Sequence, residues 1–165
     1  MGSNLTAKPH PVQKIVSGGQ TGADRAALDW AIANRFEHGG WCPQGRLAED
    51  GAIPGKYHLS ETPSADYAER TACNVRDSDG TVIFSTRERL TGGSLTALES
   101  AIKQSRPYLH LHAGHGKRAG EMLSKWLNDK HIRVLNVAGP RSSEEPMIGE
   151  FVQQVLGEAL LSSGA

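Results

Sequence analysis

The stretch VSGGQTGADRAALDWA, residues 16–31, decides the fold of this chain. A short apolar run ends at Val16, three glycines follow at residues 18–22, and apolar residues then recur at helical spacing from Ala27 to Ile32. A strand that enters a helix through a glycine-rich turn is typical of a βαβ unit, and glycines let a ligand approach the backbone. The unpaired N–H groups at the start of such a helix favour an anion.

The rest of the chain repeats this alternation of strand and helix. The sequence predicts strands at residues 14–17, 39–42, 80–84, 108–111 and 133–137, and helices at residues 23–36, 64–76, 95–104, 118–128 and 147–161. Short, almost wholly apolar strands such as TVIF (81–84) are typical of a sheet covered on both faces. We therefore expect an α/β fold, a Rossmann-like three-layer sandwich with a mostly parallel sheet of about five to six strands.

Length, charge and cysteine content bound the function. The 165 residues suit one domain, which we place at residues 14–165 after a flexible N-terminal arm at residues 1–13. Lys+Arg and Asp+Glu balance at 18 each, so there is no basic excess to indicate a nucleic-acid partner. No membrane helix or signal peptide is indicated, and the two cysteines, Cys42 and Cys73, form no Cys-x-x-Cys pair. We expect a cytoplasmic protein without a membrane partner.

Three strand-to-helix turns resemble one another, and each predicts part of a ligand site. Ligands of an open parallel sheet bind beyond the carboxyl ends of its strands, so these turns should meet at one edge. The candidate ligand residues are Gly18, Gly19, Gln20, Thr21, Gly22 and Arg25 in the first turn, Gly92, Gly93, Ser94 and Thr96 in the second, and Gly139, Pro140 and Arg141 in the third. Amides, hydroxyls and arginines favour a small anionic ligand, an oxyanion or a phosphate. The alternative is three purely structural turns.

Other polar residues are weaker candidates. No Walker sequence and no strict Gly-x-Gly-x-x-Gly occurs, so a dinucleotide site is weakly supported. Arg46 lies in a long polar segment and could reach the ligand, whereas Arg70 and Asn74 share one face of a helix and could face either the ligand or a neighbouring subunit, or form an exposed helix end. His110 and His112 alternate along a strand, but the spacing offers no third ligand, and we predict no metal site.

Five segments together resemble a known family. They are SGGQTGADRAALD, GGWCPQGRLAEDGAIP, ERTACNVRDSDGTVIFS, LTGGSLTALE and LNVAGPR, and they are similar to the circularly permuted YpsA-type SLOG family over residues 14–155. Members of this family are commonly described as molybdenum carriers. The resemblance implies the Rossmann-like SLOG fold shared with molybdenum-cofactor carriers and Lonely Guy phosphoribohydrolases, with ligand binding on the glycine loops and a homodimer or homotetramer.

The resemblance leaves three functions open. A carrier would hold molybdate or molybdenum cofactor, and a nucleotide-sensing module would use the same loops for a nucleotide. The hydrolase relatives carry Pro-Gly-Gly-x-Gly-Thr-x-x-Glu, which TGGSLTALE at residues 91–99 resembles. Glu99 would be the catalytic acid/base of a nucleoside-monophosphate phosphoribohydrolase. Thr91 and Leu95 replace the proline and the inner glycine of that motif, which favours the non-catalytic carrier.

Overall fold

A parallel five-stranded sheet forms the centre of the computed structural model, which describes residues 10–161. The strand order is β2-β1-β9-β7-β8, and every neighbouring pair is parallel. The bounds are β1 (Lys14–Val16), β2 (Glu37–Gly39), β7 (Gly80–Ser85), β8 (Tyr108–His112) and β9 (Val134–Ala138). All five predicted strands are therefore present in some form, and the carboxyl ends of the sheet strands lie at one edge.

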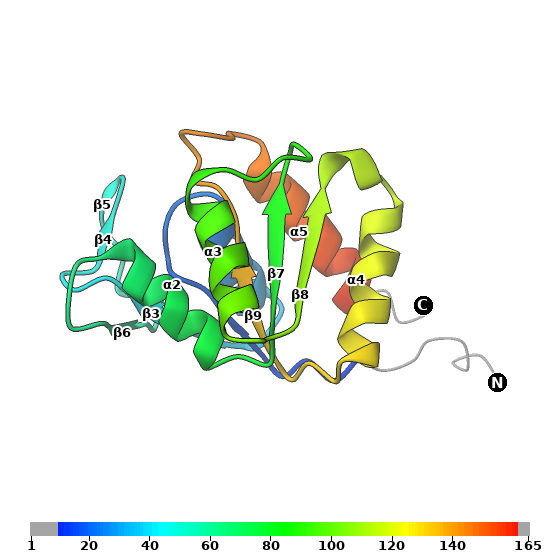
Figure 1. Ribbon diagram of the computed structural model, residues 1–165, viewed down its shortest axis with the longest axis horizontal. Helices are drawn as coiled ribbons and strands as arrows, with labels where there is room; N and C mark the ends of the chain where they lie inside the picture. The colour runs from blue at the N-terminus through cyan, green and yellow to red at the C-terminus, as the bar shows by residue number, and fades with distance from the viewer. Residues whose placement is uncertain (1–9, 162–165) are drawn as a thin grey trace.

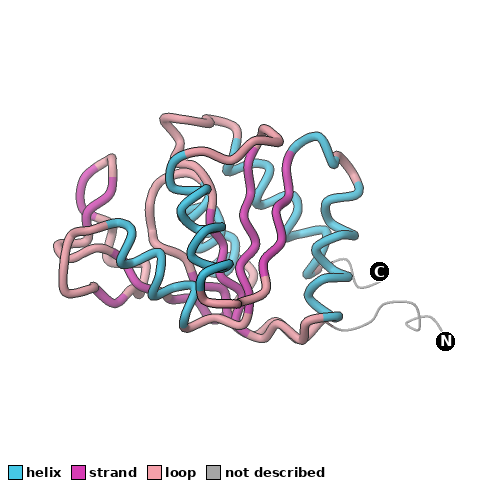
Figure 2. Tube along the Cα trace, viewed as in Figure 1, coloured by secondary structure: helices cyan, strands magenta, loops and turns pink. Residues whose placement is uncertain are grey.

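Helices cover both faces of this sheet (Figure 1). On one side α1 (Ala23–Ala33) and α4 (Arg118–Asp129) pack against α5 (Ile148–Leu160), and on the other α2 (Tyr67–Arg76) packs against α3 (Gly92–Lys103). The tube view separates the same layers (Figure 2). The protein is a Rossmann-like three-layer sandwich, as predicted.

The core explains why the strands are so uniformly apolar. Every residue of β7 is buried, and side chains alternate between the two faces of a strand. Val82 and Phe84 join the large hydrophobic cluster that also contains Leu123 and Leu156 of α4 and α5. Ile83, which is also fully buried, lies outside that cluster and belongs to the opposite face. A sheet buried on both faces needs no polar alternation.

Several element boundaries differ from the prediction. Helix α1 ends three residues before the expected end and α2 begins three residues after the expected start, and two further differences involve glycines. The strand expected at 39–42 is split: β2 ends at Gly39, and β3 (Trp41–Cys42) pairs instead with β6 (Ser60–Glu61) in a small second sheet. The break lies at Gly40, where φ is 127° and a Cβ would stand 2.3 Å from the Ser17 carbonyl oxygen. Helix α3 begins at Gly92, three residues earlier than expected. The Leu95 amide donates to the Thr91 carbonyl, so two glycines, which have low helix propensity, form part of its first turn.

The long polar segment at 43–63 contains a hairpin. Strands β4 (Leu47–Ala48) and β5 (Gly51–Ala52) pair antiparallel and project from the body of the protein (Figure 1). Its base is fixed by Arg46, whose guanidinium donates to the carbonyls of Ile53, Pro54 and Tyr57. Ile53 and Tyr57 are buried with Leu28 and Cys42 in a second hydrophobic cluster.

The described part of the predicted N-terminal arm, residues 10–13, contacts the domain; residues 1–9 lie outside the description. Val12 is buried, the His10 Nε2 atom lies 3.1 Å from the Leu160 carbonyl oxygen, and the Gln13 amide donates to the Arg133 carbonyl. Among the helices within residues 10–161, none combines the length and apolar character needed to cross a membrane.

Candidate functional site

A cavity of about 240 Å³ lies at the carboxyl ends of the strands. Four segments line it: the turn after β1, helix α2, the first turns of α3, and β9 with the loop that follows it. The lining residues are Gln20, Asp24, Tyr67, Ala68, Arg70, Thr71, Gly93, Thr96, Ala97, Ala138, Gly139, Pro140, Arg141 and Glu144. Helix α1 covers one face of the sheet and α3 covers the other. The cavity therefore lies where the connections after neighbouring strands run to opposite faces, which is the usual place for a ligand in an open α/β sheet.

The cavity brings together residues from all three glycine turns. Seven of the predicted ligand residues line it: Gln20, Arg70, Gly93, Thr96, Gly139, Pro140 and Arg141. Sequence reasoning did not assign Asp24, Tyr67 or Glu144, which also line it. Asp24 could have been recognised as a candidate from its position in the first turn of a helix that follows a glycine turn, where the helix dipole favours an acidic residue.

Two residues that line this cavity each carry a buried side-chain donor without a partner among residues 10–161. The donors are Nε2 of Gln20 and Nε of Arg70. The Gln20 residue is only 6% exposed, and its Oε1 accepts from the Thr21 and Glu49 amides at 3.0 and 2.8 Å. These two bonds fix the orientation of the amide and leave Nε2 as the free donor. A buried unpaired donor costs stability, so each atom would gain from an acceptor that a ligand brought within reach.

Arg70 is held by a buried ion pair with Asp24. The Nη1–Oδ2 distance is 2.9 Å, and the two side chains are 13% and 6% exposed. Burial raises the pKa of Asp24, while Arg70 and the Gln20 amide oppose that rise. The guanidinium lies directly on Gly18, where a Cβ would stand 1.5 Å from Nη1. The first glycine of the turn thus gives space to an arginine of this chain.

The start of α3 offers further donors to the cavity. Thr91 precedes the helix without a side-chain cap, and the first turn contains no acidic residue. No heavy atom lies within 4 Å of the position a Cβ would take on Gly93, so this backbone is openly accessible. Helix N-terminal amides with a positive dipole end suit an oxyanion.

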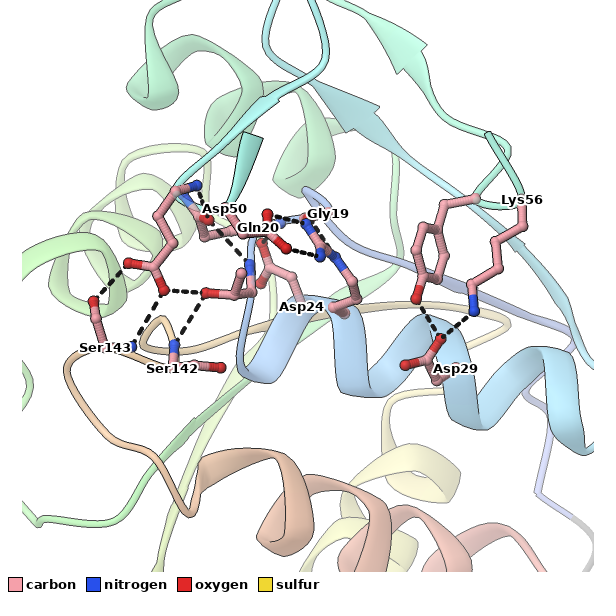
Figure 3. Close-up of polar contacts among 12 residues, drawn as sticks. Gly19, Gln20, Asp24, Asp29, Asp50, Lys56, Ser142 and Ser143 are labelled. Carbon is pink, nitrogen blue, oxygen red and sulfur yellow. Dashed lines mark hydrogen bonds and ion pairs between the residues drawn. The ribbon is translucent and has the colours of Figure 1, made fainter. Parts of the chain in front are cut away.

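Beside the cavity, the first and third glycine turns bind an acidic side chain. Figure 3 shows Gln20, Ser142 and Ser143 gathered around the turn after β1. The Ser143 amide and hydroxyl donate to the Glu49 carboxylate at 3.2 and 2.6 Å, and the Thr21 hydroxyl donates to it as well. These hydrogen bonds lower the pKa of Glu49. The Arg141 guanidinium lies 4.0 Å away.

Several predicted residues have other partners. Arg25 donates to the Gly19 carbonyl and to Asp50, as Figure 3 shows for Gly19 and Asp50. The Asn74 amide pairs with both backbone groups of Trp41. The residues of the predicted site that lie outside the cavity lining are Gly18, Gly19, Thr21, Gly22, Arg25, Arg46, Asn74, Gly92, Ser94 and Glu99. Glu99 is exposed on α3.

Two histidines of β8 and one in the turn that follows it form a small cluster of rings. The ring centroids of His112 and His115 are 4.0 Å apart, and those of His110 and His112 are 5.6 Å apart. Nδ1 of His112 accepts from the Gly114 amide and Nδ1 of His115 from the His112 amide, so the neutral rings carry their proton on Nε2. Within residues 10–161, no group of three or more His, Cys, Asp or Glu side chains is placed to hold a metal ion.

Comparisons with known proteins agree with this architecture. The family model described as "Circularly permutated YpsA SLOG family" matches residues 15–160. A solved structure from Syntrophus aciditrophicus SB, named "Putative molybdenum carrier protein", is 43% identical with a TM-score of 0.89 and covers 94% of this chain and 98% of its own. No curated protein matches. Since the family match spans most of the chain and the fold follows the same plan, this protein belongs to the circularly permuted YpsA SLOG family.

Proposed function

We propose that this protein is a carrier that binds a small oxyanion, either molybdate or the phosphate group of molybdenum cofactor, in the cavity beyond β1 and β9. The observation that carries the proposal is the pair of buried, unpartnered donors, Gln20 Nε2 and Arg70 Nε, beside the open start of α3. Amide, guanidinium and helix N-terminal donors together suit a tetrahedral oxyanion. The name of the Syntrophus protein supports molybdenum as the element.

The charges of the lining bear on which ligand fits. Arg70 and Arg141 are balanced by Asp24 and Glu144, so the cavity has no large positive excess. Hydrogen bonds rather than net charge would then select the ligand. The Tyr67 ring at the same cavity adds an aromatic surface, and the carboxylates could accept from ring N–H groups. These features favour the cofactor, an organic ring system with a phosphate, over bare molybdate.

Replacing Gln20 with glutamate tests the cavity. The glutamate keeps an oxygen for the Thr21 and Glu49 amides but replaces the Nε2 donor with a carboxylate oxygen. We expect anion affinity to fall at least tenfold, because a lost hydrogen bond to a charged group is worth about 1.5–3 kcal/mol and repulsion adds to it. Equilibrium dialysis against molybdate, with bound molybdenum counted by mass spectrometry and with excess sulfate as competitor, measures the change.

A second variant controls for charge. Gln154→Glu makes the same substitution on the exposed side of α5, away from the cavity lining, and should leave the affinity unchanged. Equal affinity of wild type and Gln20→Glu would place the ligand elsewhere. Wild-type binding that excess sulfate abolishes would indicate a general anion site rather than a molybdenum site.

A phosphoribohydrolase is the second candidate, and the motif around Glu99 is its support. Glu99 is exposed and does not line the cavity, which favours the carrier. We expect no free base to be released when the protein is incubated with several nucleoside monophosphates. Release of base that Glu99→Gln abolishes would overturn the carrier proposal in favour of the hydrolase.

A further inference from the structure

The donors that hold Glu49 form a site of their own, which we call the rim site: the Thr21 hydroxyl, the Ser143 amide and hydroxyl, and the Arg141 guanidinium. We propose that the rim site is a second oxyanion site, distinct from the cavity, and that the Glu49 carboxylate occupies it in the free protein as an internal competitor. The inference rests on the proposed function only for the class of ligand, an oxyanion or phosphate group.

The contacts of the Glu49 carboxylate are those an oxyanion would make. Oε1 accepts from the Ser143 hydroxyl at 2.6 Å, and Oε2 accepts from the Thr21 hydroxyl and from the Ser143 amide. The Ser142 amide in turn donates to the Thr21 hydroxyl oxygen at 3.1 Å, which orients that hydroxyl toward the carboxylate. These groups come from two loops at the carboxyl edge of the sheet, where hydroxyls and free amides bind phosphate and related anions.

The hairpin that supplies Glu49 is built to move about a fixed base. Both residues of β5 are exposed, and Leu47 of β4 is 45% exposed, so the tip buries no large apolar side chain. Polar contacts hold the tip: the Glu49 contacts above and an ion pair between Asp50 and Arg25 at 2.7 Å. The Asp50 side chain of this pair is 48% exposed, so solvent weakens the attraction. The base is clamped by Arg46 and by the buried Ile53, so the tip can leave without unfolding the domain.

The rim site is adjacent to the cavity and shares one residue, Arg141, with it. Arg141 lines the cavity and also lies 4.0 Å from the Glu49 carboxylate. The Glu49 amide donates to Gln20 Oε1, one of the two bonds that orient the Gln20 donor. An anion that displaces Glu49 from the rim site would therefore also release one restraint on Gln20. The hairpin is thereby linked to the cavity through Gln20 and Arg141.

Binding stoichiometry tests the rim site. Isothermal titration with inorganic phosphate, and separately with molybdate, is made on wild type, Glu49→Ala and Asp50→Ala. We expect Glu49→Ala to bind one more anion per chain than wild type, because the rim donors are then free. Asp50→Ala removes an equal charge from the same hairpin tip but leaves the rim site occupied, so it should match wild type. An unchanged stoichiometry in Glu49→Ala, or an equal gain in Asp50→Ala, would overturn the inference.

Further variants assign the extra anion and guard against misfolding. Adding Ser143→Ala and Thr21→Val to Glu49→Ala should abolish the additional binding, because both hydroxyl donors are lost. Glu49→Gln keeps the size of the side chain and should also gain the anion, with weaker affinity since the amide oxygen still competes. Additional binding that survives the loss of both hydroxyls would contradict the assignment to the rim.

This experiment can reject the rim-site proposal and the cavity proposal separately. If wild type binds no anion and Glu49→Ala binds one, the cavity proposal is wrong and the rim site stands. If both bind one, the rim site is wrong and the cavity proposal stands. Combining Gln20→Glu with Glu49→Ala isolates the rim site, and we expect that variant to retain one anion.

Discussion

Replacing Arg70 with alanine is expected to lower the free energy of unfolding by about 3–5 kcal/mol at neutral pH. Arg70 is the ion-pair partner of Asp24, whose carboxylate is 6% exposed, at 2.9 Å. Removing the guanidinium leaves a buried charge that keeps its contact with the Gln20 amide at 3.3 Å but has lost its neutralising partner. Under the proposed function the same variant should also lose anion binding, because Arg70 lines the cavity and its Nε is an unpaired buried donor.

Urea unfolding followed by circular dichroism measures this loss of stability. Two further variants separate the effect of the stranded charge from the effect of losing an ion pair. Adding Asp24→Asn to Arg70→Ala removes the stranded charge and should restore most of the stability without restoring anion binding. Arg76→Ala is the matched control, because Arg76 and Asp77 form an ion pair at the end of the same helix with side chains that are 56% and 47% exposed. We expect Arg76→Ala to cost much less stability than Arg70→Ala, because solvent screens an exposed ion pair. A loss that persists in Arg70→Ala/Asp24→Asn would show that packing on Gly18, rather than charge, is what Arg70 contributes.

The pH dependence of the same variants has a definite sign. Burial raises the pKa of Asp24 above its usual value of 3.8, and Arg70 is the largest influence that opposes this rise. In Arg70→Ala the pKa of the folded state should therefore rise further. A folded-state pKa above the unfolded value means that stability falls as pH rises from the unfolded pKa to the folded one. The difference in stability between Arg70→Ala and Arg70→Ala/Asp24→Asn should be largest at neutral pH and should shrink as the pH falls toward the unfolded pKa.

Gly22→Ala is expected to destabilise the fold by about 2–6 kcal/mol. Gly22 has φ 84° and ψ −128°, a conformation that costs an alanine about 1–3 kcal/mol. Its Cβ would also stand 2.4 Å from the Pro140 carbonyl oxygen and 2.8 Å from the Ser142 amide, and relieving such a clash costs about 1–3 kcal/mol more. The first and third glycine turns can meet only because Gly22 has no side chain.

Gly93→Ala is the control for this variant. Gly93 lies in the first turn of α3 with open space where a Cβ would be, so alanine there should be neutral or stabilising by up to about 1 kcal/mol. Unfolding in urea compares the two variants directly. A Gly22→Ala protein within about 1 kcal/mol of wild type would mean that the loop after β9 can move away from the turn after β1 at little cost.

Periodicity alone predicted most of the fold. The apolar run TVIF and the 3.6-residue repeat of helix α5 are local signals. A strand buried on both faces is apolar throughout, and a helix buried on one face has apolar residues at helical spacing. The errors were at boundaries that packing decides. Gly40 ends β2 because of its approach to Ser17, a contact between residues that no local pattern connects.

The candidate site was predictable in part, for a similar reason. Parallel strands place their carboxyl ends at one edge, so residues such as Gln20, Gly93 and Arg141 could be expected together from the order of elements alone. The glycines of the first turn were expected to make room for a ligand. Gly18 and Gly22 instead make room for Arg70 and for the backbone at Pro140, and nothing in the spacing of the turn distinguishes the two uses.

The sequence by itself determined the layered α/β fold, the family and the edge of the sheet where the candidate cavity lies, because these depend on residue types that recur along the chain. Only the tertiary structure determined that Asp24 pairs with Arg70, that Gln20 and Arg70 each keep an unpaired donor, and that the Glu49 carboxylate binds the donors of the rim site. Each of these joins residues 28 or more positions apart or depends on which atoms remain unpaired after folding. These contacts and unpaired atoms depend on which segments pack together and which hydrogen bonds they form with one another, and both are determined only in the folded chain.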